Sequence, residues 1–234
     1  MTTSFLRVLG AALLDLLLPG ACGGCGAPGP GWCAACRARL VPSWPALPGC
    51  PPVVAVGRYR GPLRTALLAY KERGRRDLAA PLARLLAGAL LSSALLSEEG
   101  PPGGWWLVPA PSRPTAARAR GGDHVHRLCR HVARSDPRLR VAPALALGRG
   151  ARDSVGLDAA ERAANLAGRL RVRAAGLPPA GAVVLLVDDV VTTGATLRAC
   201  RAALAREGRH VTAAVVLADA TRGRDQGIPD WASK

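Results

Sequence analysis

Short apolar runs alternate along the chain with longer segments whose apolar residues recur at helical spacing. Runs of aliphatic residues bounded by Gly or Pro predict strands, and the helical spacing predicts amphipathic helices. The predicted strands cover residues 53–59, 105–111, 140–148, 182–187 and 210–218. The predicted helices cover residues 61–71, 78–96, 123–134, 158–169 and 196–207. This alternation predicts an α/β fold in which helices flank a parallel sheet.

Changes in composition divide the chain into three parts. Residues 1–52 hold an apolar N-terminal helix, a segment rich in Gly, Pro and Cys, and a linker; residues 53–219 hold the predicted α/β domain, and residues 220–234 a polar tail. The apolar stretch near the N-terminus is too short to cross a bilayer and contains Asp15. We therefore expect it to dock on the protein itself and expect no membrane span.

Composition and charge leave the choice of ligand open. Aromatic residues make up only 3% of the chain and apolar residues 49%, so Ala, Leu and Val must fill the core. The net charge is +16, and Lys71 and Lys234 are the lysines, so nearly all the positive charge is on arginine. Arginine attracts polyphosphates and nucleic acids alike, and many arginines can also be plain solvated surface. Charge alone does not decide between nucleotide chemistry and DNA binding.

Four of the seven cysteines form two Cys-x2-Cys pairs, Cys22 with Cys25 and Cys33 with Cys36. This spacing is typical of a structural Zn2+ site with four thiolate ligands, which would organise a segment with little apolar content. Free buried or redox-active cysteines are the alternative. Either interpretation indicates a reducing compartment, and we expect the cytoplasm.

The segment of residues 183–196, VVLLVDDVVTTGAT, is the most informative part of the chain. It places Asp188 and Asp189 at the carboxyl end of an apolar strand, followed by a Thr-Gly loop and a helix, which is where ligands bind in open α/β sheets. The helix N-terminus and Gly194 suit a phosphate, and the lysine of a P-loop is absent, so we expect a monophosphate. The carboxylates suit ribose hydroxyls or a hydrated Mg2+ ion; the alternative is that they cap a turn.

This segment resembles the signature for 5-phosphoribosyl 1-diphosphate (PRPP) in type I phosphoribosyltransferases. The chain more widely resembles the ComF/GntX family, through the cysteine module and four further motifs. These motifs are Tyr70-Lys71-Glu72-Arg73-Gly74, residues 107–111, residues 155–162 with Asn165-Leu166, and the acidic segment itself. The resemblance implies a type I phosphoribosyltransferase-like sheet and a zinc-binding N-terminal module.

The resemblance also implies a set of site residues. It assigns PRPP and its Mg2+ to Lys71, Pro109, Ala110, Arg113, Asp188, Asp189, Val190, Thr192, Thr193, Gly194, Ala195 and Thr196. Asp188 and Asp189 would hold the ribose hydroxyls and are the candidate catalytic residues, Asp189 being the nearest candidate general base. Residues 113–122 would fold over the diphosphate.

Several functions stay open at this point. Members of the family often carry Arg-Gly-Phe-Asn-Gln after the basic loop, whereas here Gly122, Asp123 and His124 follow Arg120-Gly121, so the acceptor could differ or catalysis could be lost. The chain could transfer the phosphoribosyl group as a glycosyltransferase, hydrolyse PRPP, or sense it. It could also be a non-catalytic competence factor for DNA uptake that binds single-stranded DNA or an uptake helicase. A homo-oligomer is possible, and a second metal on His124, His126, Cys129 and His131 is less favoured than a basic helix near an anion.

Overall fold

The computed structural model describes residues 20–29, 31–93, 95–96, 100–112, 122–148 and 168–221. The predicted N-terminal helix, the basic loop with Arg113, most of the predicted helix at residues 158–169, and the tail beyond residue 221 lie outside these residues. No helix in the described ranges combines the length and the apolar character needed to cross a membrane.

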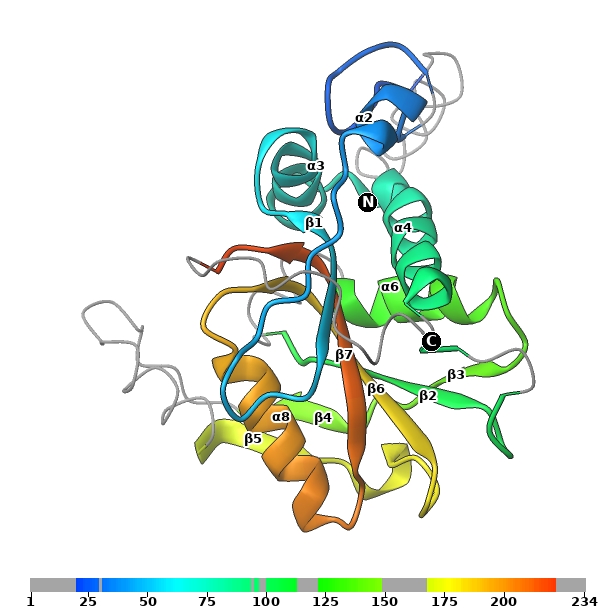
Figure 1. Cartoon of the computed structure of the whole chain (residues 1–234), viewed down its shortest axis with the longest axis vertical. Helices are drawn as coiled ribbons and strands as arrows, with labels where there is room; N and C mark the ends of the chain where they lie inside the picture. The colour runs from blue at the N-terminus through cyan, green and yellow to red at the C-terminus, as the bar shows by residue number, and fades with distance from the viewer. Residues whose placement is uncertain are drawn as a thin grey trace, which may run out of the picture.

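Five parallel strands form the central sheet (Figure 1). In the order β1-β7-β6-β2-β3 they comprise β1 (Val53–Arg58), β7 (Val211–Asp219), β6 (Val183–Val191), β2 (Trp105–Pro109) and β3 (Leu139–Val141). The central strands β6 and β7 are nearly continuous Val, Leu and Ala, as expected of strands covered on both faces. Because all pairs are parallel, the carboxyl ends of the five strands lie at one edge.

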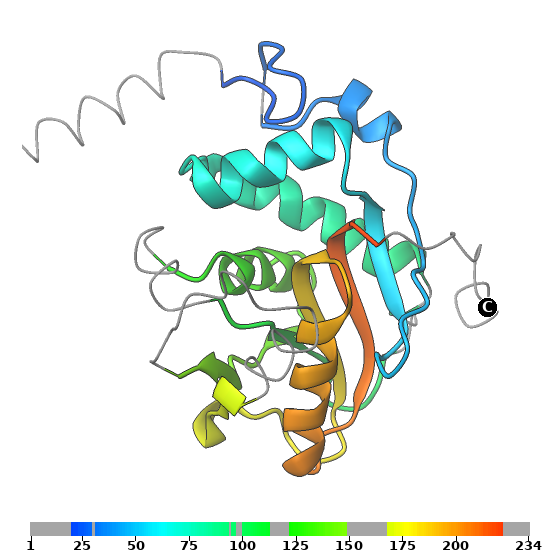
Figure 2. The ribbon, with the colours of Figure 1, turned by 90° about the vertical axis from the view of Figure 1, so that its left-hand side faces the viewer.

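Helices cover both faces of this sheet, which confirms the predicted fold class. Helices α3 (Gly61–Glu72), α4 (Ala79–Ser92) and α6 (His124–Ala133) share one buried cluster with the β6 side chains Leu185 and Val187. Helix α8 (Ala195–Arg206) packs in a second cluster on the other face, with Val184 and Leu186. In Figure 2 the N-terminal module, with α2 (Ala34–Ala38), lies over α3 and away from α8. Two short 3-10 turns complete the list, at Arg76–Leu78 and Ala174–Gly176.

Two strand predictions were wrong in their extent. The predicted strand at residues 140–148 is two strands, because Pro143 has no N–H to donate and interrupts the run. Its second half, β4 (Leu145–Leu147), leaves the main sheet and pairs antiparallel with β5 (Leu170–Val172), which the sequence did not predict. The predicted strand at residues 182–187 continues to Val191, so both acidic residues lie inside β6 rather than beyond its end.

The linker before β1 is attached to the sheet. Ser43 pairs with Ala55 in an antiparallel bridge, and its buried hydroxyl donates to the Asp219 carboxylate over 2.9 Å. Arg58 bonds the same carboxylate oxygen over 2.8 Å, so the buried charge of Asp219 has both a cationic and a hydroxyl partner. These contacts fix the path of residues 40–52 along the edge of the domain.

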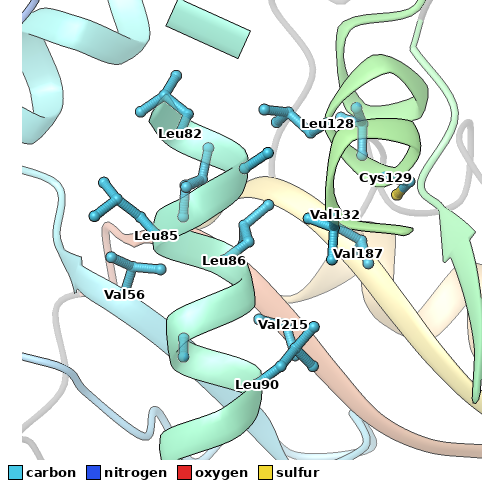
Figure 3. Packing of buried hydrophobic residues seen from close by; sticks show 14 of the residues in the cluster. Val56, Leu82, Leu85, Leu86, Leu90, Leu128, Cys129, Val132, Val187 and Val215 are labelled. Carbon is cyan, nitrogen blue, oxygen red and sulfur yellow. The ribbon is translucent and has the colours of Figure 1, made fainter. Parts of the chain in front are cut away.

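Helix α4 supplies the centre of the larger core cluster (Figure 3). Leu82, Leu86 and Leu90 recur every four residues and are fully buried, and Leu86 and Leu90 point toward α6 and the sheet, while Leu91 stays 59% exposed. Burial of such side chains supplies the main driving force for folding.

We predict that Leu86→Ala lowers the free energy of unfolding by about 2–5 kcal/mol, because it removes fully buried methyl groups and leaves a cavity. The matched control Leu91→Ala changes an exposed leucine on the same helix and should stay within about 0.5 kcal/mol of wild type. Urea unfolding monitored by circular dichroism measures both. Equal losses in the two variants would contradict this packing.

Candidate functional site

The loop between β6 and α8 has the geometry of a phosphate cradle. Gly194 adopts φ +75° at the N-cap of α8, and a Cβ there would lie 2.6 Å from Cys50 Sγ, so the position requires glycine. Glycine provides no side-chain cap for the first turn of α8, which leaves the amides of that turn available to an anion. Thr192 and Thr193 are exposed and add hydroxyl donors beside them.

The two adjacent aspartates face opposite sides of the sheet, because successive side chains alternate along a strand. Asp188 is partly exposed on the α8 side, where its Oδ1 accepts the Asp189 backbone N–H over 2.8 Å. Asp189 is buried on the side of α3 and α6. Lys71 Nζ of α3 lies 2.8 Å from Asp189 Oδ2, and His124 Nε2 of α6 hydrogen-bonds the same oxygen.

These different surroundings separate the protonation of the two carboxyl groups. Burial, and then the negative charge of Asp189, raise the pKa of Asp188 to about 8. Burial alone would raise the pKa of Asp189 as well, but the hydrogen bond from His124 and the charge of Lys71 outweigh it and lower that pKa to about 2. At neutral pH the pair therefore carries one negative charge, located on Asp189.

The predicted turn after β2 lies next to the acidic strand. Pro109 is paired with Val187 of β6, and the Ala110 N–H donates to the Val187 carbonyl over 2.8 Å. The structure thus brings Lys71, the start of this turn and the acidic pair together at one edge of the sheet.

Asp123 and His124 hold together the turn after β2 and the start of α6, which was not predicted from the sequence. Asp123 caps α6 by accepting the N–H groups of Val125 and His126, and its second oxygen accepts the Ser112 N–H over 2.9 Å. His124 Nδ1 lies 3.0 Å from Ser112 Oγ, and the Tyr70 hydroxyl donates to the His124 carbonyl over 2.9 Å. Asp123-His124 depart from the Arg-Gly-Phe-Asn-Gln pattern, and this marked the segment as unusual. The sequence did not indicate that these residues contact Ser112 and Asp189.

A cavity of about 180 Å³ opens beside this turn. Its lining includes Pro109, Pro111, Ser112, Asp123, Leu145 and Arg173. The cavity lies between the turn after β2 and the small β4–β5 sheet, so apolar walls and a few polar groups surround it.

The four N-terminal cysteines form one cluster, as their spacing predicted. Their sulfur atoms all lie within 4.8 Å of one another, and the Cys22–Cys36 and Cys25–Cys33 Sγ pairs are each separated by 3.7 Å. Tetrahedral Zn2+ with Zn–S bonds of about 2.3 Å requires sulfur separations of roughly 3.8 Å, so the cluster fits zinc. Burial opposes ionisation of Cys22, but N–H donors from Cys25, Cys33 and Gly24 outweigh it and lower its pKa to about 6.

Known proteins match parts of this chain. Residues 148–232, which include the acidic strand and the loop after it, match the sequence model of the phosphoribosyl transferase domain. Orotate phosphoribosyltransferase of Erythrobacter litoralis is 49% identical over 53 residues, which are 22% of this chain and 28% of that protein. The match therefore spans less than a third of the relative's length.

Solved structures of phosphoribosyltransferases are also similar to the chain. Hypoxanthine phosphoribosyltransferase of Trypanosoma cruzi is 19% identical, with a TM-score of 0.33, over 66% of this chain and 73% of the other. The Staphylococcus aureus enzyme is 16% identical, with a TM-score of 0.34, over 63% and 69% of the two chains. The sequence match is confined to residues 148–232, and the described chain has a parallel sheet flanked by helices, which is the arrangement of the type I phosphoribosyltransferase fold class.

Proposed function

We propose that the protein binds PRPP with Mg2+ at the carboxyl edge of β6 and releases diphosphate by transferring the phosphoribosyl group to a nucleophile or to water. The observation that carries this proposal is the juxtaposition of an uncapped helix N-terminus at Gly194 with the partly exposed carboxyl group of Asp188. An anion site and a hydroxyl acceptor side by side match the two ends of a ribose 5-phosphate.

Each part of the substrate has a candidate partner. The loop of residues 192–196 receives the 5-phosphate through amides and threonine hydroxyls. Asp188 accepts hydrogen bonds from the ribose hydroxyls, while Asp189 orders Lys71 and His124 behind it. The turn of residues 109–112 faces the diphosphate. A Mg2+ ion bound together with PRPP would supply positive charge to the leaving diphosphate, with Asp188 as the nearest partly exposed carboxyl group of the site.

The alternative of a nucleic-acid-binding competence factor, with single-stranded DNA or a helicase as partner, stays a prediction. Binding of single strands uses exposed aromatic rings as stacking platforms. In the described part of the chain Trp105 and Tyr70 are buried, and the rings of Trp106 and Tyr59 lie against Arg140 and Arg64. These contacts favour the phosphoribosyl proposal. ComF/GntX membership, oligomerisation and cytoplasmic location likewise stay predictions.

We predict that the double variant Asp188→Asn/Asp189→Asn weakens PRPP·Mg2+ binding by about 100-fold. Each ribose hydrogen bond to the uncharged Asp188 carboxyl group contributes about 0.5–1.5 kcal/mol, and the change at Asp189 removes the charge that holds Lys71 and His124 in place. Isothermal titration calorimetry measures the loss, and circular dichroism checks the fold. The control Glu207→Gln, at the far end of α8, should bind like wild type. Unchanged affinity in the double variant would refute the site.

We predict that Asp188→Asn stabilises the free protein increasingly as pH rises from about 4 to about 8. Asp188 has a pKa near 3.9 when unfolded and about 8 when folded, so the folded wild type binds more protons and loses stability across this window. Asn cannot ionise and avoids that loss. The ionised Asp189 carboxylate stabilises the folded protein, because its pKa is lower when folded than when unfolded. This stabilisation is lost only as pH falls toward 2.

Differential scanning fluorimetry at several pH values tests this prediction. The melting temperature of Asp188→Asn minus that of wild type should widen between pH 5 and pH 8. A constant difference would show that Asp188 ionises normally.

We also propose that the four-cysteine cluster holds a structural Zn2+. We predict about one zinc per purified chain, lost on Cys33→Ser together with a fall in melting temperature, because the metal organises the module. Cys200→Ser, a buried cysteine of α8 outside the cluster, should retain the metal. Inductively coupled plasma mass spectrometry measures the content. Zinc-free wild-type protein with the same melting temperature as zinc-loaded protein would contradict the proposal.

A further inference from the structure

Three side chains from distant parts of the chain form a continuous hydrogen-bonded series at the candidate site. Ser112 Oγ lies 3.0 Å from His124 Nδ1, and His124 Nε2 bonds Asp189 Oδ2. His124 and Asp189 are 5% and 6% exposed, whereas Ser112 is partly exposed. The series therefore begins at the surface of the site and ends in the interior.

The direction of the hydrogen bonds follows from the charge on Asp189. An ionised carboxylate only accepts, so His124 Nε2 carries the hydrogen and Nδ1 presents a lone pair. The Ser112 hydroxyl then donates to Nδ1, which makes its oxygen more basic toward a second partner. Lys71 at 2.8 Å from the same Asp189 oxygen favours the ionised form, and the Tyr70 hydroxyl anchors the His124 backbone.

Ser112 is held in place and faces a cavity. Its N–H donates to Asp123, and Ser112 is one of the residues that line the cavity of about 180 Å³ next to the turn of residues 109–112. A buried histidine that only supports the fold commonly bonds to backbone or to one carboxylate. Here both ring nitrogens bond to side chains, and one of those side chains belongs to a residue of the cavity lining.

We propose that Ser112, His124 and Asp189 form a proton relay, with a small N–H or O–H nucleophile in the cavity as the proton source. The inference rests on the proposed PRPP chemistry. The bond from C1 to the diphosphate oxygen breaks, and diphosphate leaves with the electron pair. The lone pair of the nucleophile forms the new bond to C1. Its proton passes to Ser112 Oγ while the hydroxyl proton passes to His124 Nδ1, and the imidazolium later returns a proton to water.

In this arrangement Ser112 is the catalytic residue, because it touches the nucleophile. His124 and Asp189 are positioning residues that act through it. The charged and titratable groups around His124 are Asp189 of β6, Lys71 and the Tyr70 ring of α3, and Asp123 at the start of α6.

The variants His124→Gln and Ser112→Ala test the relay, with His131→Gln as a control on the last turn of the same helix. Gln keeps a donor for Asp189 but takes up no proton. Calorimetry with PRPP and Mg2+ measures binding, and release of diphosphate with water alone and with ammonia as the nucleophile measures turnover. We expect affinities within about threefold of wild type. We expect turnover to fall by about 10²–10⁴-fold in His124→Gln, which also loses the histidine limb of the pH–rate profile, while the control is unchanged.

The outcomes separate the relay from the proposed function. Wild-type protein that does not bind PRPP overturns both. Wild-type protein that binds PRPP but releases no diphosphate with either nucleophile overturns the relay and the transfer step of the proposed function, and leaves the PRPP site standing. His124→Gln with wild-type turnover overturns the relay alone. Nitrogen NMR of the free protein gives an independent reading: hydrogen on Nε2, and a shift of the bare Nδ1 signal in Ser112→Ala, support the relay. Hydrogen on Nδ1 overturns it without any substrate.

Discussion

The buried carboxylate of Asp189 and its two cationic or polar partners hold the functional edge of the sheet together. A charge that leaves water must find compensating partners inside the protein, and Lys71 and His124 provide them from α3 and α6. Because these partners come from two helices, the carboxylate fixes both helices relative to β6. The Asp123 cap then connects the start of α6 to the turn after β2. Groups from four elements thus share one network.

The same network gives two neighbouring aspartates different properties. Strand alternation directs Asp189 toward the cationic face and Asp188 toward the start of α8, so only one of them meets Lys71 and His124. Among the described residues, Asp188 consequently faces the charge of Asp189 with only the weaker influence of Lys71 to offset it. Two chemically identical side chains are thereby prepared for different tasks, one as a permanent charge and one as a group that gains or loses a proton near neutral pH.

The sequence predicted the parts of this structure that depend on local pattern. Apolar runs predict β6 and β7, and Pro62 predicts the start of α3, each to within a few residues. The paired cysteines predict the cluster that they form. Pro143 was a readable signal for the break between β3 and β4, and the prediction of one strand overlooked it. The bond between His124 and Asp189 could not be predicted in this way, because it joins residues 65 positions apart and depends on how α6 packs against the sheet. The close approach of Cys50 to Gly194 could not be predicted either, because these residues are far apart in the sequence and meet only through tertiary packing.

The central claim is that the loop of residues 192–196 receives the phosphate of a phosphorylated ribose. Amide chemical-shift mapping with ribose 5-phosphate tests it most directly, because that compound carries the phosphate and hydroxyls without the diphosphate. We expect saturable shifts at Thr193, Gly194, Ala195 and Thr196, with weaker shifts at Asp188. Shifts confined instead to the arginine-lined cavity at Arg39 and Arg60, near the start of α3, would contradict it.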